Sequence, residues 1–125
     1  MPQTKVLLVE ESPSIRALIP WQLEGLDLAF IGTGSIKEAQ AALRSERPDL
    51  MITEIVFRGG WRAGMQFVSD AHKARQDLAI IVHTAENVGG IADATMRIGA
   101  MAFVPKVSRV PNELKDTVRV YLPHK

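Results

Sequence analysis

The sequence contains no cysteine, almost no net charge and no long hydrophobic run, and each of these absences excludes a class of protein. Without cysteine there are no disulfide bonds and no thiolate metal sites. A net charge of +1 gives no support for a non-specific nucleic-acid clamp. No apolar run approaches the roughly 20 residues of a membrane-spanning helix, and the first run is too short for the core of a signal peptide. We therefore expect a cytoplasmic protein that binds neither nucleic acid nor a membrane directly.

The length of 125 residues and the 46% of hydrophobic residues are typical of one globular domain, and we expect a single domain over residues 1–125. Short apolar runs alternate with amphipathic stretches, which predicts five strand–helix units. The predicted strands are 6–9, 28–31, 50–53, 79–82 and 101–104. Because these strands are continuous apolar runs, they favour a parallel sheet covered on both faces. The expected fold class is α/β, a doubly wound (βα)₅ fold with strand order 2-1-3-4-5.

Acidic residues follow two of the predicted strands. Glu10 and Glu11 come after the first strand, and Glu54 follows the third. The carboxyl ends of parallel strands form the edge where α/β proteins bind ligands. In the expected strand order, Thr84 and Lys106 join the acids at this edge. Carboxylates hold divalent cations, a carboxylate can attack phosphorus, and a hydroxyl and an ammonium group stabilise phosphoryl oxygens. The set therefore predicts phosphoryl chemistry.

Five segments together resemble the receiver domain of bacterial response regulators, a CheY-like (flavodoxin-like) fold. They are Lys5–Leu18, Ser35–Ala39, Arg47–Glu54, Ile81–Ala85 and Gly99–Lys106. The resemblance implies that Glu10 and Glu11 stand at the Mg²⁺-binding acidic pair and Glu54 at the phosphoacceptor, which also contacts the metal. It implies that Thr84 and Lys106 contact the phosphoryl group, and that Thr84 and Phe103 form the conformational switch.

Several positions depart from the pattern of this family. Glutamate replaces the phosphoacceptor aspartate at Glu54, and the extra methylene moves the carboxylate outward by roughly 1.5 Å. Displacement on this scale can reduce a positioned reaction on the order of 10²-fold. Longer side chains at Glu10 and Glu11 disturb the near-octahedral geometry that Mg²⁺ demands. The family's Lys-Pro is Lys106-Val107 here, so we expect a trans bond. These departures predict a degenerate receiver, or pseudo-receiver.

Each singled-out residue has a second interpretation. Glu54 either imitates a phosphorylated aspartate while paired with Lys106, or is an ordinary solvated or salt-bridged acid. Glu10 and Glu11 either retain a divalent cation, or have their repulsion relieved by Lys106 or by protonation. Phe103 is either a switch or a packing aromatic.

Four further side chains are expected to have no role in the site chemistry. We expect His83, Arg58 and Trp61 at the surface, and Trp21 packed against the edge of the first helix. An exposed Trp61 beside the site would favour a partner contact, since tryptophan is enriched at binding hot spots.

The leading functional hypothesis is a non-enzymatic receiver that signals through protein–protein contact without ordinary aspartyl phosphorylation. The expected partner is a histidine kinase or an output protein, docked on the face formed by the helix through Ile91–Ile98, the strand 101–104 and the helix from Pro111. The alternative is a receiver that still binds Mg²⁺ and accepts a phosphoryl group on Glu54 or a neighbour. A nucleotide-binding module is disfavoured, because the turn after Val9 has no glycines.

Overall fold

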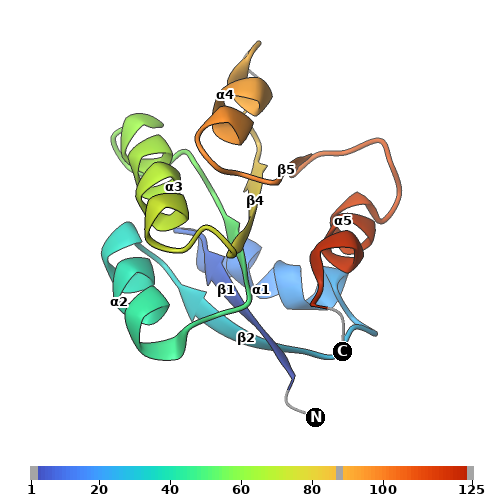
Figure 1. Ribbon diagram of the computed structural model, residues 1–125. Coiled ribbons are helices and arrows are strands. Elements are labelled where there is room, and N and C mark those ends of the chain that lie inside the picture. The colour runs from blue at the N-terminus through green and yellow to red at the C-terminus, as the bar shows by residue number, and fades with distance from the viewer. Residues whose placement is uncertain (1–2, 87–88, 124–125) are drawn as a thin grey trace.

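The computed structural model describes residues 3–86 and 89–123, in which strands and helices alternate along the chain (Figure 1). The strands are β1 (Thr4–Val9), β2 (Leu28–Thr33), β3 (Leu50–Thr53), β4 (Ala79–Thr84) and β5 (Ala102–Pro105). The helices are α1 (Pro13–Gln22), α2 (Ile36–Glu46), α3 (Arg62–Ala74), α4 (Ile91–Arg97) and α5 (Glu113–Tyr121).

All strand pairs in the sheet are parallel, and the strand order is β2-β1-β3-β4-β5. The register places Val9 opposite Thr33 on one side and opposite Thr53 on the other. The predicted α/β fold and its strand order are therefore confirmed. Because β1 and β3 are neighbours, the segments that follow them lie next to each other.

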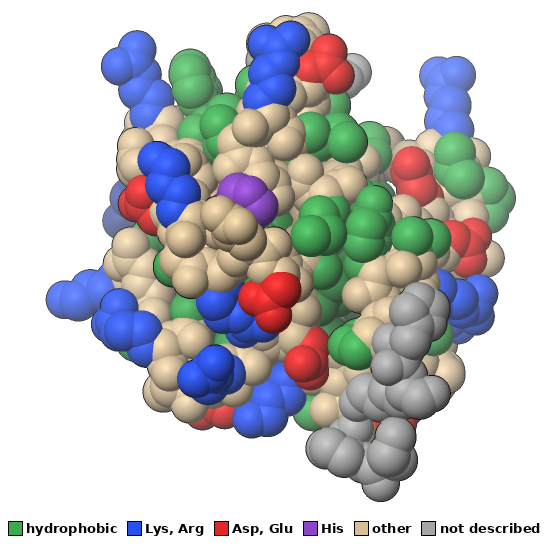
Figure 2. Space-filling model, in the orientation of Figure 1, with side chains coloured by type: hydrophobic (Ala, Val, Ile, Leu, Met, Phe, Trp, Pro, Cys, Tyr) green, Lys and Arg blue, Asp and Glu red, His purple; other side chains and the backbone are tan. Residues whose placement is uncertain are grey.

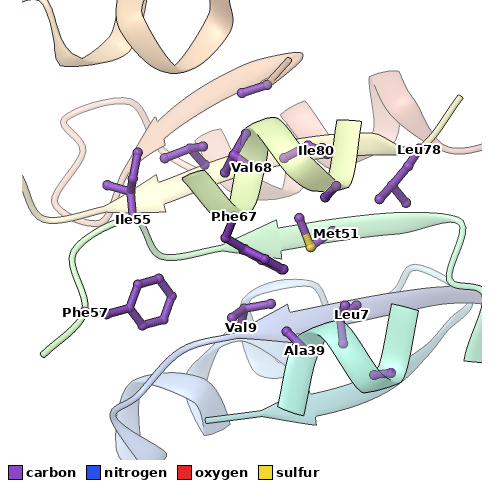
Figure 3. Packing of buried hydrophobic residues seen from close by; sticks show 14 residues of the cluster. Leu7, Val9, Ala39, Met51, Ile55, Phe57, Phe67, Val68, Leu78 and Ile80 are labelled. Carbon is purple, nitrogen blue, oxygen red and sulfur yellow. The ribbon is translucent and has the colours of Figure 1, made fainter. Parts of the chain in front are cut away.

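The central strands are buried on both faces, which explains why their sequences are continuous apolar runs. Alternate residues of β1 enter two different cores: Leu7 and Val9 face one core, and Val6 and Leu8 face the other. Figure 3 shows the first core, where Phe67 of α3 and Ala39 of α2 lie over the sheet. The second core joins the other side of the sheet to residues of α1 and α5.

The predicted caps of the first two helices are confirmed. The Ser12 hydroxyl accepts a hydrogen bond from the Ile15 N–H at 3.3 Å, with proline at the first helical position. The Ser35 hydroxyl accepts from the Glu38 N–H at 3.1 Å, and the Glu38 carboxylate reaches back to the Gly34 N–H at 2.9 Å. These local contacts fix where the helices that flank the sheet begin.

Two surface predictions are wrong. His83 is 5% exposed, because β4 continues through Thr84, two residues beyond the predicted end, and places the imidazole inside the sheet. Trp21 is 74% exposed instead of packed. It lies two residues beyond the buried Ile19 on α1, and two residues along a helix turn a side chain to nearly the opposite side. Arg58 and Trp61 are exposed as predicted.

The surface is uneven in character. Figure 2 shows hydrophobic side chains gathered between α4 and α5, over β5, whereas Lys and Arg side chains project over α2 and α3. None of the helices in the described parts of the chain combines the length and the apolar character that crossing a bilayer requires.

Candidate functional site

The carboxyl ends of four adjacent strands bring the predicted site residues to one edge of the sheet. Glu10 follows β1, Glu54 follows β3, Thr84 ends β4 and Lys106 follows β5. The Glu54 N–H donates to the Val9 carbonyl at 2.8 Å, which extends the pairing of β1 and β3 into the site. The parallel register therefore brings together side chains that lie up to 96 positions apart in the chain.

A lysine occupies the centre of the site. The Lys106 ammonium donates a hydrogen bond to Glu54 Oε1 at 2.6 Å and makes a second, very short ion pair with Glu10 Oε1. The exposed fraction is 13% for the lysine side chain, 6% for that of Glu10 and 7% for that of Glu54. We call these three residues the Glu–Lys–Glu cluster. One buried cation between two buried anions relieves their mutual repulsion.

The remaining carboxylate oxygens of the cluster are also bound, by backbone N–H groups. Glu54 Oε2 accepts from Ile55 at 2.5 Å and from Val56 at 2.9 Å. Glu10 Oε2 accepts from Ser12 at 3.1 Å. Because each oxygen has a donor, both side chains are held in a single orientation, which limits the desolvation cost of burying them.

Titration of the cluster reflects these contacts. Burial raises the pKa of Glu54, but the hydrogen bond from Lys106, the Thr84 hydroxyl and the two backbone N–H groups together lower it further, so the pKa lies below its usual value of 4.5. Burial lowers the pKa of Lys106, but the hydrogen bonds and charges of Glu10 and Glu54 raise it above 10.5. Glu54 and Lys106 are therefore both ionised at neutral pH.

The third predicted acid lies apart from the cluster. Glu11 is exposed, and its Oε1 accepts a hydrogen bond from the Arg58 N–H at 2.8 Å. Arg58 belongs to a tight turn in which Phe57 and Gly60 exchange backbone hydrogen bonds. Glu11 therefore ties the β1–α1 connection to the β3–α3 connection. The three carboxylates do not converge on one point.

The start of α3 is held against the end of β3 at Gly64. A Cβ atom at this position would lie 2.0 Å from the Ile55 carbonyl oxygen, so only glycine permits the approach. Ile55 also supplies one of the N–H groups that hold Glu54. Close packing of α3 on this segment therefore supports the geometry of the cluster.

Thr84 and Phe103 lie beside the cluster. Thr84 is fully buried, and its hydroxyl accepts from the Glu86 N–H at 3.2 Å. The Thr84 hydroxyl also contributes to the lowered pKa of Glu54. Phe103 is half-buried and packs against the core on the α2 and α3 side of the sheet. The structure thus places Thr84 beside Glu54, whereas Phe103 pairs in register with Val82 of β4.

The residues as arranged do not fit a magnesium ion. Mg²⁺ needs carboxylate oxygens that are free to enter an octahedral shell at about 2.0–2.1 Å. Here Lys106 and backbone N–H groups bind the oxygens of Glu10 and Glu54, and Glu11 turns to Arg58. Among residues 3–86 and 89–123, no group of three potential ligands is suitably placed for a metal.

Sequence reasoning assigned no role to two residues that the structure places at the site. Arg16 Nη1 donates to the Glu10 carbonyl at 2.6 Å, which holds the end of β1 against α1. His83 Nδ1 lies 2.9 Å from the Val104 carbonyl, on the side of the sheet opposite Phe103. The signal for His83 was its position between Val82 and Thr84 in a continuous strand. No sequence signal identified Arg16.

Solved structures support the same fold. The chain is similar to the chemotaxis protein CheY4 of Vibrio cholerae, with a TM-score of 0.78 and 24% identity, covering 97% of this chain and 100% of that one. It is also similar to the BeF₃-activated N-terminal receiver domain of RstA from Klebsiella pneumoniae, with a TM-score of 0.83 and 22% identity, covering 96% and 99%. At these identities the likeness concerns the fold.

Sequence relatives are longer proteins. The chain is 28% identical over 120 residues to the DNA-binding transcriptional regulator NtrC of Azospirillum brasilense, covering 96% of this chain and 24% of that protein. A second relative, from Pseudomonas aeruginosa, is 28% identical over 104 residues, covering 82% and 49%. The chain thus spans at most about half the length of these curated relatives.

The family comparison covers nearly the whole fold described above. Residues 6–119 match the response regulator receiver domain, a span that runs from β1 into α5 and includes every residue of the Glu–Lys–Glu cluster. Receiver domains of this kind work with histidine kinases or output domains in two-component signalling. The chain belongs to the response regulator receiver domain family.

Proposed function

We propose that this receiver domain signals by binding a protein partner, without ordinary aspartyl phosphorylation and without acting as an enzyme. In this proposal the Glu–Lys–Glu cluster is a permanent replacement for the metal and phosphoryl group of a phosphorylated receiver. The partner is a histidine kinase or an output protein in the cytoplasm. The domain is then a pseudo-receiver whose input is a binding event.

One observation carries the proposal, namely the Lys106 ammonium bound simultaneously by Glu10 and Glu54. A phosphoacceptor carboxylate must attack phosphorus with a free oxygen. Both Glu54 oxygens already accept hydrogen bonds, Oε1 from Lys106 and Oε2 from Ile55 and Val56. Phosphorylation would first have to break a buried ion pair, which costs several kcal/mol when one partner is left alone.

The proposed partner surface is the face formed by α4, β5 and α5. Strand β5 pairs only with β4 in the described sheet, so its outer edge remains open. Hydrophobic side chains gather at this place (Figure 2), and Met96 of α4 is 48% exposed. An open strand edge beside exposed apolar side chains favours a protein contact. Phe103 lies on β5, which belongs to this face.

Chemical phosphorylation tests the proposal directly. The protein is incubated with acetyl phosphate and Mg²⁺, and its intact mass is measured. We expect no adduct on the natural chain, whereas one phosphoryl group would add about 80 Da. A matched variant with Glu10→Asp, Glu11→Asp and Glu54→Asp restores the shorter acids of the family and serves as the control. An adduct on the natural chain at Glu54 would support the alternative, phosphorylation-competent receiver.

Backbone NMR shifts give a second readout. Spectra are recorded with and without Mg²⁺ and beryllofluoride, a phosphoryl mimic. Unchanged signals for residues around Glu54 and Thr84 support the proposal. Shifts that spread from Glu54 to Phe103 and the α4–β5–α5 face would contradict it, because they would reveal a working phosphorylation switch.

A further inference from the structure

A groove lies on the other side of β5 from Phe103. This groove has a volume of about 630 Å³ and runs between the end of α1 and the start of α5. His83 and Val104 line its floor, and Trp21 of α1 lines its rim. Its volume lies within the range of about 300–1,000 Å³ that is typical of small-molecule sites. Nothing in the Glu–Lys–Glu cluster requires this groove.

The floor of the groove presents one hydrogen-bond acceptor from a largely buried side chain. His83 is 5% exposed, and its Nδ1 lies 2.9 Å from the Val104 carbonyl oxygen. A carbonyl only accepts, so Nδ1 carries the proton, and the neutral ring then has a lone pair at Nε2. Burial, opposed by the Val104 contact, lowers the pKa of His83, which keeps the ring neutral at pH 7.

Nε2 of His83 has no partner among the described residues. Among the described residues, the buried side-chain atom without a hydrogen-bond partner is His72 Nδ1. His83 Nε2 is therefore not fully buried. Nε2 is therefore reached from the groove that the ring lines. An unpaired acceptor that is accessible from a groove can be matched by a ligand that donates an N–H or O–H group.

The walls of the groove limit the charge of such a ligand. Two acids, Glu24 and Glu113, and two bases, Lys106 and Lys115, line the groove. The ammonium group of Lys106 is already bound by the cluster, so no excess of positive charge remains. An anionic ligand would find no net attraction here, whereas a neutral one loses little solvation on entry.

The rim provides an aromatic surface. Trp21 is 74% exposed, and its indole is available for offset stacking with a planar ring. An aromatic surface beside the His83 acceptor suits a planar molecule that carries a hydrogen-bond donor.

We propose that this groove binds a neutral planar heterocycle with an N–H donor, such as an indole, which hydrogen-bonds to His83 Nε2 and stacks on Trp21. The inference holds whether or not Glu54 is phosphorylated. It assigns the domain a small-molecule site between α1 and α5, which borders the predicted phosphorylation site at Lys106 and shares β5 and the start of α5 with the proposed partner face.

The test uses the intact chain labelled with ¹⁵N and titrated with indole, with 1-methylindole as the matched ligand lacking the N–H group. Indole should give saturable shifts of the amide signals around Val104 and Asn112, which line the groove. 1-Methylindole should bind about fivefold or more weakly, as expected for the loss of one hydrogen bond. This comparison needs no variant and is unaffected by folding defects.

Two variants locate the contacts. His83→Asn keeps an N–H group near the Val104 carbonyl but removes the Nε2 acceptor, so it should bind both compounds with the same weak affinity. Trp21→Ala should weaken both compounds equally, because stacking does not depend on the N–H group. Equal affinity of the natural chain for the two compounds would overturn the proposal, as would indole shifts confined to other surfaces or an absence of saturable shifts up to the solubility of indole.

Discussion

The Glu–Lys–Glu cluster and the groove, two regions next to strand β5, differ in how their polar groups are hydrogen-bonded. At the carboxyl edge, Lys106, Glu10 and Glu54 satisfy one another and the nearby backbone N–H groups. In the groove, His83 satisfies only one of its two nitrogens and leaves the other facing a hollow. Lys106 belongs to both places, because it lines the groove and its ammonium group lies in the cluster.

The difference shows that fully paired polar groups stabilise one conformation, whereas an unpaired polar group can bind a ligand. A buried charged group with every atom paired is costly to rearrange, so it fixes one conformation. An accessible polar atom that no protein group binds is left free to accept a hydrogen bond from water or from a ligand. The polar groups at the position that resembles a phosphorylation site are thus fully paired. The unpaired nitrogen of His83 lies in the groove, for which the family resemblance predicted no role.

Removing Lys106 disrupts the Glu–Lys–Glu cluster and should cause the largest loss of stability. Lys106→Met leaves two buried carboxylates without a cation, and we expect the free energy of unfolding to fall by about 3–5 kcal/mol. Urea denaturation at pH 7 measures this. Lys5→Met is the control, because Lys5 and its partner Glu46 are about half exposed and such pairs contribute at most about 1 kcal/mol. Equal losses in the two variants would show that the cluster is not a stabilising unit.

Neutralising one carboxylate should have an intermediate effect. Glu54→Gln removes a charge-assisted hydrogen bond to Lys106 and turns an amide N–H toward that cation or toward the Ile55 and Val56 donors. We expect a loss of about 1.5–3 kcal/mol in the same denaturation experiment. Glu11→Gln is the matched control, since Glu11 is exposed and lies outside the cluster. A larger loss of stability for Glu11→Gln than for Glu54→Gln would show that Glu11, and not Glu54, is the acid that stabilises the fold.

The dependence of the unfolding free energy on pH should distinguish the contribution of His83 in the groove from that of Glu54 in the cluster. The pKa of His83 is lowered below 6.5, so the unfolded chain binds a proton first and stability falls as the pH drops below 6.5. The pKa of Glu54 is lowered below 4.5, so its stabilisation is complete above 4.5 and is lost as the pH falls through the lowered value.

Unfolding free energies measured from pH 8 to pH 3 follow both losses. Compared with the natural chain, His83→Asn should flatten the curve below pH 6.5, and Glu54→Gln should flatten it below pH 4.5. If Glu54→Gln flattened the upper range instead, the two groups would be coupled and the comparison of two independent sides would fail.

Truncating the rim tryptophan should have the smallest effect on stability. Trp21→Ala removes a side chain that is 74% exposed, and we expect a change within about 0.5 kcal/mol. Leu23→Ala, two residues later and 1% exposed, should cost about 2–5 kcal/mol. Thermal unfolding of the two variants compares them directly. A large loss for Trp21→Ala would show that the indole supports the fold and is not reserved for a ligand.

Local sequence patterns predicted the fold well because they are properties of single elements. Continuous apolar runs gave the five strands, and Ser12 and Ser35 gave the starts of two helices. The strand order came with the doubly wound fold class, for which 2-1-3-4-5 is a common order. The structure confirms it through the register that joins Val9 to both Thr33 and Thr53.

The local pattern failed where a polar residue interrupted an apolar run. The predicted fourth strand stopped at Val82, although β4 continues to Thr84 and buries His83. Neighbouring strands and the Val104 carbonyl make this burial favourable, and neither is visible in the local sequence. Trp21 was misplaced for a different reason, because its position on α1 was not compared with that of Ile19.

By itself the sequence determined which charged groups reach the carboxyl edge, since strand order and strand ends follow from apolar runs and family spacing. Only the tertiary structure decided how those groups pair. Side-chain length and the neighbouring N–H groups let Glu10 and Glu54 close on Lys106, while Glu11 turns to Arg58. Pairing depends on differences of a few tenths of an ångström in the distances between side chains that are far apart in the chain. The linear sequence does not contain these distances.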